Sequence, residues 1–366
     1  MVLDYIKTME YRKRLADEVL KDKLEASRAV LVEGAKWCGK TTTSKQIAKS
    51  VLYMQEPTKK KQNLLMADTN PSLLLQGKTP RLIDEWQLAP KLWDAVRFEV
   101  DQRDDFGQFI LTGSAVPPDT SEISHSGTGR ISRMLMRPMS LFESGESSGS
   151  VSLEGLFNTD YEVSASVESD IEKLAFLICR GGWPKAVGKS LKVALQQALD
   201  YYDAVVNSDI SRVDGKERNP ERAKLLLRSY SRNIGSQAKF EEIRQDILGN
   251  DVDSFSIDTL YDYLYALNKI FVVEDAPAWN PNLRSKAAIR NTDTRYFVDP
   301  SIATASLGLG PKDLINDLST MGLLFENLCV RDLRIYAQSI GGEIYHYRDK
   351  SGLECDTVVH LRNGSY

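Results

Sequence analysis

Short apolar runs alternate with longer amphipathic stretches through the first part of the chain. A charged stretch with helical apolar spacing covers residues 1–28, and a helix is expected from Lys40 to about Met54. Runs with the composition of buried strands occur at residues 29–33, 63–67, 81–85 and 108–112. Strands that alternate with helices predict a parallel sheet with helices on its faces, so the expected fold class is α/β.

The pattern changes twice further along the chain. Ser, Gly and Glu dominate residues 142–160 and indicate a linker, and residues 168–270 then carry helical periodicity. Strand-like segments return from Phe271, with one more helix expected from Met321 to Gln338. We predict four units, at residues 1–150, 151–218, 219–300 and 301–366.

A glycine-rich motif follows the first predicted strand. Gly34-Ala-Lys-Trp-Cys-Gly39-Lys40-Thr41 matches G-x-x-x-x-G-K-[ST] in full and lies between a strand and a helix, as this motif requires. In such a loop backbone N–H groups surround phosphates, Lys40 meets the β- and γ-phosphates, and Thr41 ligates Mg²⁺. The motif therefore predicts a P-loop NTPase that uses ATP and Mg²⁺. Its expected nucleotide contacts are Gly34, Ala35, Lys36, Trp37, Cys38, Gly39, Lys40, Thr41 and Thr42.

Two later strands end in groups that suit phosphoryl transfer. Arg81-Leu-Ile-Asp84-Glu85 predicts a metal role for Asp84, shared with Thr41, and a role for Glu85 toward the attacking water. Thr112 and Ser114 end the next strand, which in a P-loop sheet lies beside the strand that carries Asp84. Either hydroxyl could sense the γ-phosphate or simply cap the strand. The predicted catalytic residues are Lys40, Glu85, Thr112 and Arg130.

Arg130 is selected by its position after the strand that carries Thr112. An arginine in that place can act in trans on a neighbouring subunit's nucleotide and stabilise the charge of the transition state. A solvated basic surface, shared with Arg133 and Arg137, is the alternative.

Composition adds limits to this picture. The 366 residues carry a formal net charge of −4, so contact with nucleic acid would need local basic patches. The four cysteines lie far apart, outside any metal-ligand spacing. No apolar run of about 18 residues occurs, which predicts a cytoplasmic protein without a membrane partner.

The order of these motifs resembles a widespread prokaryotic family of AAA+ ATPases that carry a C-terminal domain of unknown function. The motifs are Tyr11-Arg-Lys-Arg14, Gly34 to Thr41, Asp84-Glu-Trp-Gln87, Thr112-Gly-Ser, Gly129-Arg130, Arg180-Gly-Gly-Trp-Pro184, Tyr296-Phe-Val-Asp299, Leu324-Phe-Glu326-Asn and Glu354-Cys-Asp356. The resemblance implies ATPase roles for Lys40, Asp84 and Glu85. It also implies oligomers, such as a hexameric ring.

The C-terminal half invites two further interpretations. Residues 222–299 resemble a winged helix, whose presumed wing carries Arg284, Lys286, Arg290 and Arg295 as candidate DNA contacts. The acids Asp258 and Asp262 on its third helix argue against DNA reading there, and a packing module is the alternative. The unit from 301 resembles part of a restriction-endonuclease-like fold, with an incomplete metal site.

These observations favour an AAA+ ATPase domain that is followed in the chain by a helical lid. The protein would couple ATP hydrolysis to binding, remodelling or translocation of DNA. The alternatives are an ATP-controlled switch or scaffold with slow turnover, and a nuclease governed by ATP.

Overall fold

The computed structural model describes residues 11–103, 105–114, 126–158, 161–167, 169–249, 254–280, 292–349 and 352–366. Arg284, Lys286 and Arg290 lie outside these ranges.

A five-stranded parallel sheet forms the centre of the N-terminal part, in the order β2-β3-β4-β1-β5. The strands are β1 (Ala29–Glu33), β2 (Ser50–Tyr53), β3 (Arg81–Asp84), β4 (Phe109–Gly113) and β5 (Ile131–Leu135). Because β4 lies between β1 and β3, the carboxyl ends of these three strands meet at one edge of the sheet. The predicted α/β class and the adjacency of β3 and β4 are confirmed.

Side chains that alternate along the strands bury both faces of the sheet. Leu31, Ile83 and Leu111 pack with α3 (Lys60–Thr69) and α4 (Lys91–Arg103). The intervening residues pack on the opposite face with α1 (Leu15–Ala26) and α2 (Lys40–Ile47), and include Val30, Val32, Leu82 and Ile110. Two helical layers therefore hold the sheet, as expected for parallel strands.

Two local predictions in this part were wrong, and one strand was missed. The helix that begins at Lys40 ends at Ile47, because Ser50–Tyr53 joins the sheet as its edge strand β2. Residues 63–67 form part of helix α3, where the side chain of Asn63 donates to the Tyr53 carbonyl at 3.1 Å. Strand β5 was not predicted, since its Ser132 and Arg133 interrupt the apolar run.

The segment after the sheet is mostly helical, as predicted for residues 168–270. Its helices are α5 (Leu141–Ser144), α6 (Leu153–Leu156), α7 (Ile171–Arg180), α8 (Leu191–Ala204), α9 (Ile210–Arg212), α10 (Pro220–Arg232), α11 (Phe240–Leu248), α12 (Ile257–Lys269), α13 (Pro300–Leu307) and α14 (Pro311–Asn316), with a π-helical turn, η3 (Val205–Asp209), after α8. One hydrophobic core joins residues from Ala175 to Leu328. This core crosses the predicted boundaries at 218 and 300.

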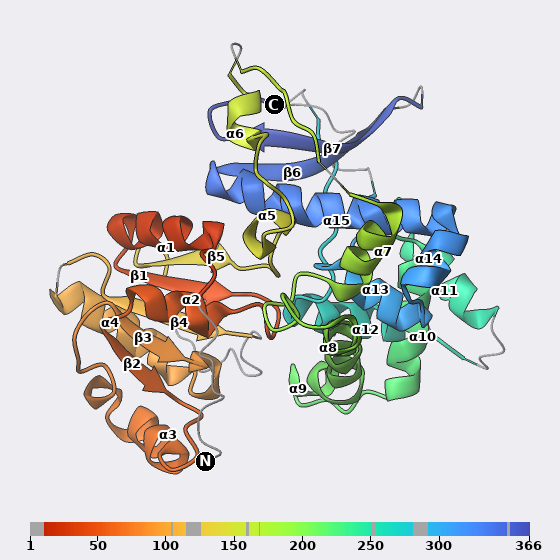
Figure 1. Ribbon diagram of the computed structural model, residues 1–366. Helices are drawn as coiled ribbons and strands as arrows, with labels where there is room; N and C mark the ends of the chain where they lie inside the picture. Colours follow the sequence, from red (N-terminus) through yellow and green to blue (C-terminus); the bar gives the residue numbers. More distant parts are fainter. Residues whose placement is uncertain are drawn as a thin grey trace, which may run out of the picture.

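The last elements lie across the rest of the molecule (Figure 1). Helix α15 (Leu318–Ser339) contacts α1, α7, α13 and α14, and the antiparallel pair β6 (Gly342–Arg348) and β7 (Glu354–Leu361) packs on it. Val330, Ala337 and Ile344 share a small core there. We call β1 to β5 with α1 to α4 the sheet domain, and α7 to α14 the helical domain. The C-terminal elements thus contact both domains. Among the described residues, none of the helices has the length and apolarity needed to span a membrane.

The region predicted to be a winged helix has three helices, α10 to α12, followed by isolated bridges that pair Val273 with Phe297 and Ala276 with Thr294. One predicted DNA contact there needs correction. Arg295 is only 4% exposed and pairs with Asp275 at 2.5 Å, while its guanidinium covers the ring of Phe240. The charge of Arg295 is therefore balanced by Asp275 inside the protein, and Arg295 is not available to contact DNA phosphates.

The acidic helix α12 also differs from the expectation. Asp262 accepts from the buried Arg218 at 2.9 Å and pairs with Lys216, so its charge is balanced within the fold. It serves to anchor the segment before α10.

Candidate active site

The glycine-rich loop between β1 and α2 depends on its two glycines. Gly34 has φ of +147°, and a Cβ there would lie 2.0 Å from the Met136 carbonyl oxygen. Gly39 has φ of +106°, which side chains of L-residues rarely adopt, and it precedes the first residue of α2. The loop therefore curls tightly before delivering the N-terminus of α2, whose exposed N–H groups favour negative charge.

Lys40 begins helix α2 and lies inside the loop. Its Nζ donates to the carbonyl oxygens of Gly34 and Ala35, each at 2.8 Å, and the residue is 6% exposed. These bonds hold the ammonium group at the centre of the curled backbone, where phosphate oxygens would be its strongest acceptors.

A carboxylate joins the loop to the sheet. Asp84 ends β3, is 2% exposed, and its Oδ1 accepts from Thr41 at 2.6 Å and from Thr112 at 2.7 Å. Thr112 faces Asp84 in the register of β3 with β4, so the contact is set by the sheet itself. The structure brings the predicted Thr41, Asp84 and Thr112 together.

Glu85 follows Asp84 in a left-handed backbone conformation with φ of +58°. Residues other than glycine rarely adopt this conformation, and those that do cluster at functional sites. The turn directs its carboxylate toward Gln87, whose side-chain amide donates to it, and toward Ser114, whose Oγ lies 3.5 Å away. Glu85 is thereby held at the end of the sheet beside Asp84 and β4.

The middle of the loop contacts the helical domain. Lys36 forms an ion pair with Asp209 of η3, and the ring of Trp37 meets Tyr201 edge to face at 5.7 Å. Tyr201 in turn stacks on Trp183 at 4.0 Å. These partners were not predicted, because only folding brings residues so distant in sequence to the loop.

Cys38 and the segment before α1 support the loop from behind. Cys38 is fully buried; its Sγ donates to the Met136 carbonyl and accepts a long contact from the Lys40 Nζ at 4.0 Å, so its side chain packs beneath the loop. Arg14 donates to the Cys38 carbonyl at 2.9 Å and pairs with the buried Glu143. Arg14, the last residue of the motif Tyr11 to Arg14, therefore supports the loop from beneath.

A cavity of about 510 Å³ opens beside the start of α2. Gly39, Thr42 and Thr43 form one side, and the opposite side comes from the helical domain. Its remaining lining residues are Tyr11, Arg12, Arg14, Met139, Pro184, Lys185, Lys189, Val193 and Gln197. This volume falls in the range of small-molecule sites.

A smaller cavity of about 40 Å³ lies at the other side of the loop, between Lys36, Ser114 and Asp209. Arg212, an exposed residue of α9, also lines it. This arginine was not singled out from the sequence, where it is one of many basic residues in a helical stretch.

Arg130 lies away from this arrangement. It precedes β5, and its backbone carbonyl accepts from Ala29 at the start of β1, so it occupies the amino-terminal edge of the parallel sheet. Its guanidinium pairs with Asp101 at 3.0 Å. Within one chain Arg130 therefore does not join Lys40 and Asp84, and its role in trans stays a prediction.

Comparison with known proteins agrees with this geometry. Residues 26–144 match the AAA domain family. The Walker-type ATPase of Pyrococcus abyssi is structurally similar, with a TM-score of 0.50, 15% sequence identity, and coverage of 81% of this chain and 96% of that one. The N-terminal domain has the P-loop NTPase fold.

Other matches extend beyond the P-loop domain. Residues 171–313 match a domain of unknown function (DUF8612), which spans the predicted boundaries at 218 and 300. Uncharacterized proteins of Mycobacterium bovis and Mycobacterium tuberculosis are each 24% identical over 367 aligned residues, covering 99% of this chain and 74% of theirs. The winged-helix and endonuclease-like resemblances are not confirmed by these matches and stay predictions.

Proposed function

We propose that this chain binds Mg·ATP at the loop Gly34–Thr41 and hydrolyses it. The observation that carries the proposal is the meeting of Thr41 and Thr112 on one carboxylate oxygen of Asp84. A loop hydroxyl, a strand hydroxyl and a buried acid converge there beside Lys40, as phosphoryl transfer requires. The match of residues 26–144 to the AAA domain family supports the same activity.

The donor set suits magnesium. Hydroxyl and carboxylate oxygens are the hard ligands that Mg²⁺ prefers, and Thr41 and Asp84 supply one of each at hydrogen-bond distance. Thr41 would hold the ion directly, with Asp84 orienting its shell. When bound, Mg²⁺ would supply neutralisation of phosphate charge.

Other side chains would position the attacking water, the phosphates and the nucleoside. Glu85 would orient the attacking water and accept its proton, and the contacts of its carboxylate with Gln87 and Ser114 support this role. Lys40 would exchange its two carbonyl acceptors for phosphate oxygens. The nucleoside would occupy the cavity beside Thr42 and Thr43.

Release of phosphate from ATP tests this proposal. The purified chain is expected to release phosphate in the presence of Mg²⁺ and to stop when the ion is chelated. The assay is repeated with single-stranded, duplex and branched DNA. If no phosphate is released under any of these conditions, the chain is not the hydrolase proposed here.

A second candidate, an ATP-controlled switch, is favoured by the contacts of Lys36 and Trp37 with the helical domain. Phosphates that enter the loop would compete with Asp209 for the charge of Lys36. Nucleotide binding would then loosen the contact between the loop and η3, and so shift the helical domain. DNA-stimulated turnover favours the motor over this switch, and a slow rate indifferent to DNA favours the switch.

Asp209→Asn is expected to tighten ATP binding by about twofold to tenfold, because it removes a competitor for Lys36 worth about 0.5 to 1.5 kcal/mol. The measurement is the dissociation constant of ATP. Asp203→Asn, which removes an acid from α8, is the matched control and should leave that constant unchanged. Weaker binding in Asp209→Asn would show that Asp209 supports the nucleotide site instead of competing with it.

Coupling to DNA and assembly into a ring also remain part of the proposal. Their support is the resemblance to AAA+ ATPases, in which sites are completed between subunits, with Arg130 as the expected residue in trans. The DNA contacts proposed at Arg284, Lys286 and Arg290 lie outside the described residues. The phosphate-release assay with single-stranded, duplex and branched DNA tests the coupling to DNA.

A further inference from the structure

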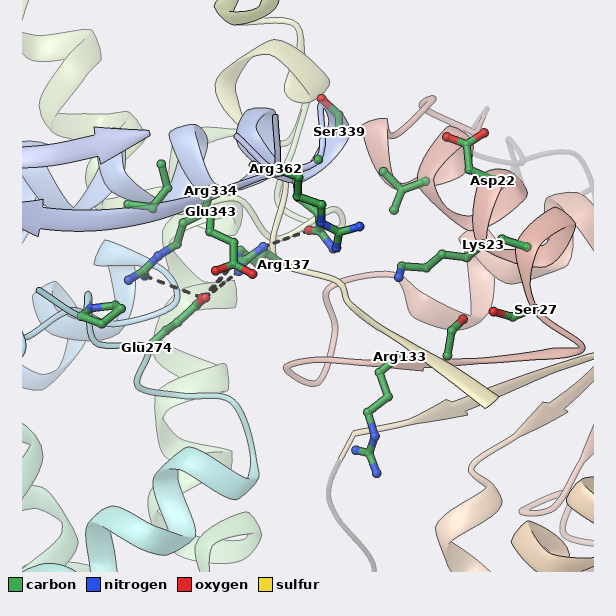
Figure 2. Close-up of a pocket in the computed structure, with 18 of the residues that line it drawn as sticks. Asp22, Lys23, Ser27, Arg133, Arg137, Glu274, Arg334, Ser339, Glu343 and Arg362 are labelled. Atoms are coloured by element: carbon green, nitrogen blue, oxygen red, sulfur yellow. Dashed lines mark hydrogen bonds and ion pairs between the residues drawn. The ribbon is translucent and has the colours of Figure 1, made fainter. Parts of the chain in front are cut away.

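A cavity of about 620 Å³, whose lining does not include the loop Gly34–Thr41, lies between the P-loop domain and the C-terminal elements. Helix α1 and strand β5 form one side, and the end of α15, the start of β6 and the turn after β7 form the other. Figure 2 shows charged side chains entering it from both sides. Such a volume is typical of a site for a small ligand.

Two cations in this cavity have no partner among the residues that the structure describes. Lys23 extends from α1, and Arg362 enters from the turn after β7 (Figure 2). Within the part of the chain that the structure describes, neither makes an ion pair or a hydrogen bond through its side chain. Burial and the nearby charge of Arg362 both lower the pKa of Lys23. The fold therefore brings like charges from opposite ends of the sequence into one space.

Two further donors in the lining make no hydrogen bond within the described ranges. The Oγ of Ser132 on β5 is buried without a hydrogen-bond partner, and so is Nη1 of Arg334 on α15. Arg334 does form an ion pair with Glu274 at 3.7 Å, so only the hydrogen-bonding capacity of its Nη1 is open. Buried polar groups in folded proteins almost always have partners, so an unpaired group calls for an explanation.

The acidic residues that line the cavity do not serve as partners for Lys23, Arg362 and Ser132. Glu274 is bound by Arg137 at 2.6 Å, and although burial would raise its pKa, Arg137 and Arg334 outweigh that effect and lower it to about 2. Asp275 is paired with Arg295. The remaining two, Asp22 and Glu343, are exposed. Apart from the exposed carboxylates of Asp22 and Glu343, the groups of the lining that remain without a partner among the described residues are hydrogen-bond donors and mostly cationic.

We propose that this cavity binds a small molecule that carries a phosphate or diphosphate group, at a site separate from the loop Gly34–Thr41. Lys23 and Arg362 supply the charge, and Ser132 and Arg334 supply further hydrogen bonds to the same anion. Lysine and arginine are the residues that proteins use for phosphate, and both gain strength when partly removed from water. Because α1 and α15 form opposite walls, the ligand would fix the C-terminal elements against the P-loop domain.

Pyrophosphate titrated into the full chain tests this site. The titration uses the Lys40→Ala background, and is repeated with wild-type chain saturated with Mg·ADP, so that the glycine-rich loop contributes little. Lys23→Met with Arg362→Met is expected to weaken pyrophosphate binding at least tenfold, and Ser132→Ala by about threefold. Failure of the nucleotide site would leave this result intact, so the two proposals are tested separately.

The matched control is Lys21→Met with Arg348→Met, which removes two cations from α1 and β6 outside the cavity. Its affinity should stay within about twofold, and all variants should show the same melting temperature as their parent. Equal weakening in this control, unchanged affinity in the cavity double variant, or no binding of pyrophosphate overturns the proposal. The proposal is also overturned if an oligonucleotide binds in a way that depends on Lys23 and Arg362 and pyrophosphate does not displace it. The ligand would then be a nucleic acid.

Discussion

Replacing Lys40 with alanine is expected to weaken ATP binding about 100-fold or more and to remove measurable turnover. The Nζ of Lys40 lies at the centre of the curled loop, 2.8 Å from two carbonyl oxygens. No other ammonium group reaches this point among the residues that the structure describes near the loop, because Lys36 is directed to Asp209. Each charge-assisted hydrogen bond lost contributes about 1.5 to 3 kcal/mol.

Lys45→Ala is the control for this change, because Lys45 is an exposed residue of the same helix. Both variants are compared with wild type by equilibrium binding of ATP and by phosphate release. A Lys40→Ala chain that binds ATP as tightly as the Lys45→Ala chain would remove Lys40 from the site.

Glu85→Gln is expected to keep ATP binding but to slow hydrolysis by about 100-fold or more. The amide conserves the shape and the hydrogen bond to Gln87, yet it cannot accept a proton from water, a contribution of about 10² to 10⁴ in rate. The left-handed backbone at Glu85 should tolerate this change, since only the side-chain terminus differs. The measurement is single-turnover hydrolysis, which separates the chemical step from product release.

The control for Glu85→Gln is Glu25→Gln on the exposed face of α1. Wild-type rates in both variants would show that Glu85 does not act on the water. Loss of ATP binding in Glu85→Gln would instead assign it to positioning the nucleotide, which the proposed role does not include.

Local sequence patterns sufficed for the parts of the fold that one strand or one motif defines. Strands β1, β3 and β4 were predicted because their apolar runs are uninterrupted, and the loop because Gly34, Gly39 and Lys40 stand at a required spacing. The hydrogen bond of Thr112 to Asp84 was not itself predicted, but it follows once their strands lie side by side. These predictions depend on few residues close together in the chain.

Features that depend on tertiary contacts escaped prediction. The apolar run at residues 63–67 looks like a strand, but the sheet recruits Ser50–Tyr53 and leaves the later run as a helix. Asp209 and Tyr201 meet the loop only after the helical domain folds against it. Arg295 had the composition of an exposed basic wing, yet Asp275 and Phe240 bury it.

Calorimetric titration of ATP into the Glu85→Gln chain tests the central claim most directly, because the nucleotide stays intact during the measurement. We predict one ATP bound per chain, tighter with Mg²⁺ than with the ion chelated, and lost when Lys40→Ala is added. Absence of ATP binding, or binding that persists unchanged without Lys40, would contradict the assignment of the glycine-rich loop as the nucleotide site.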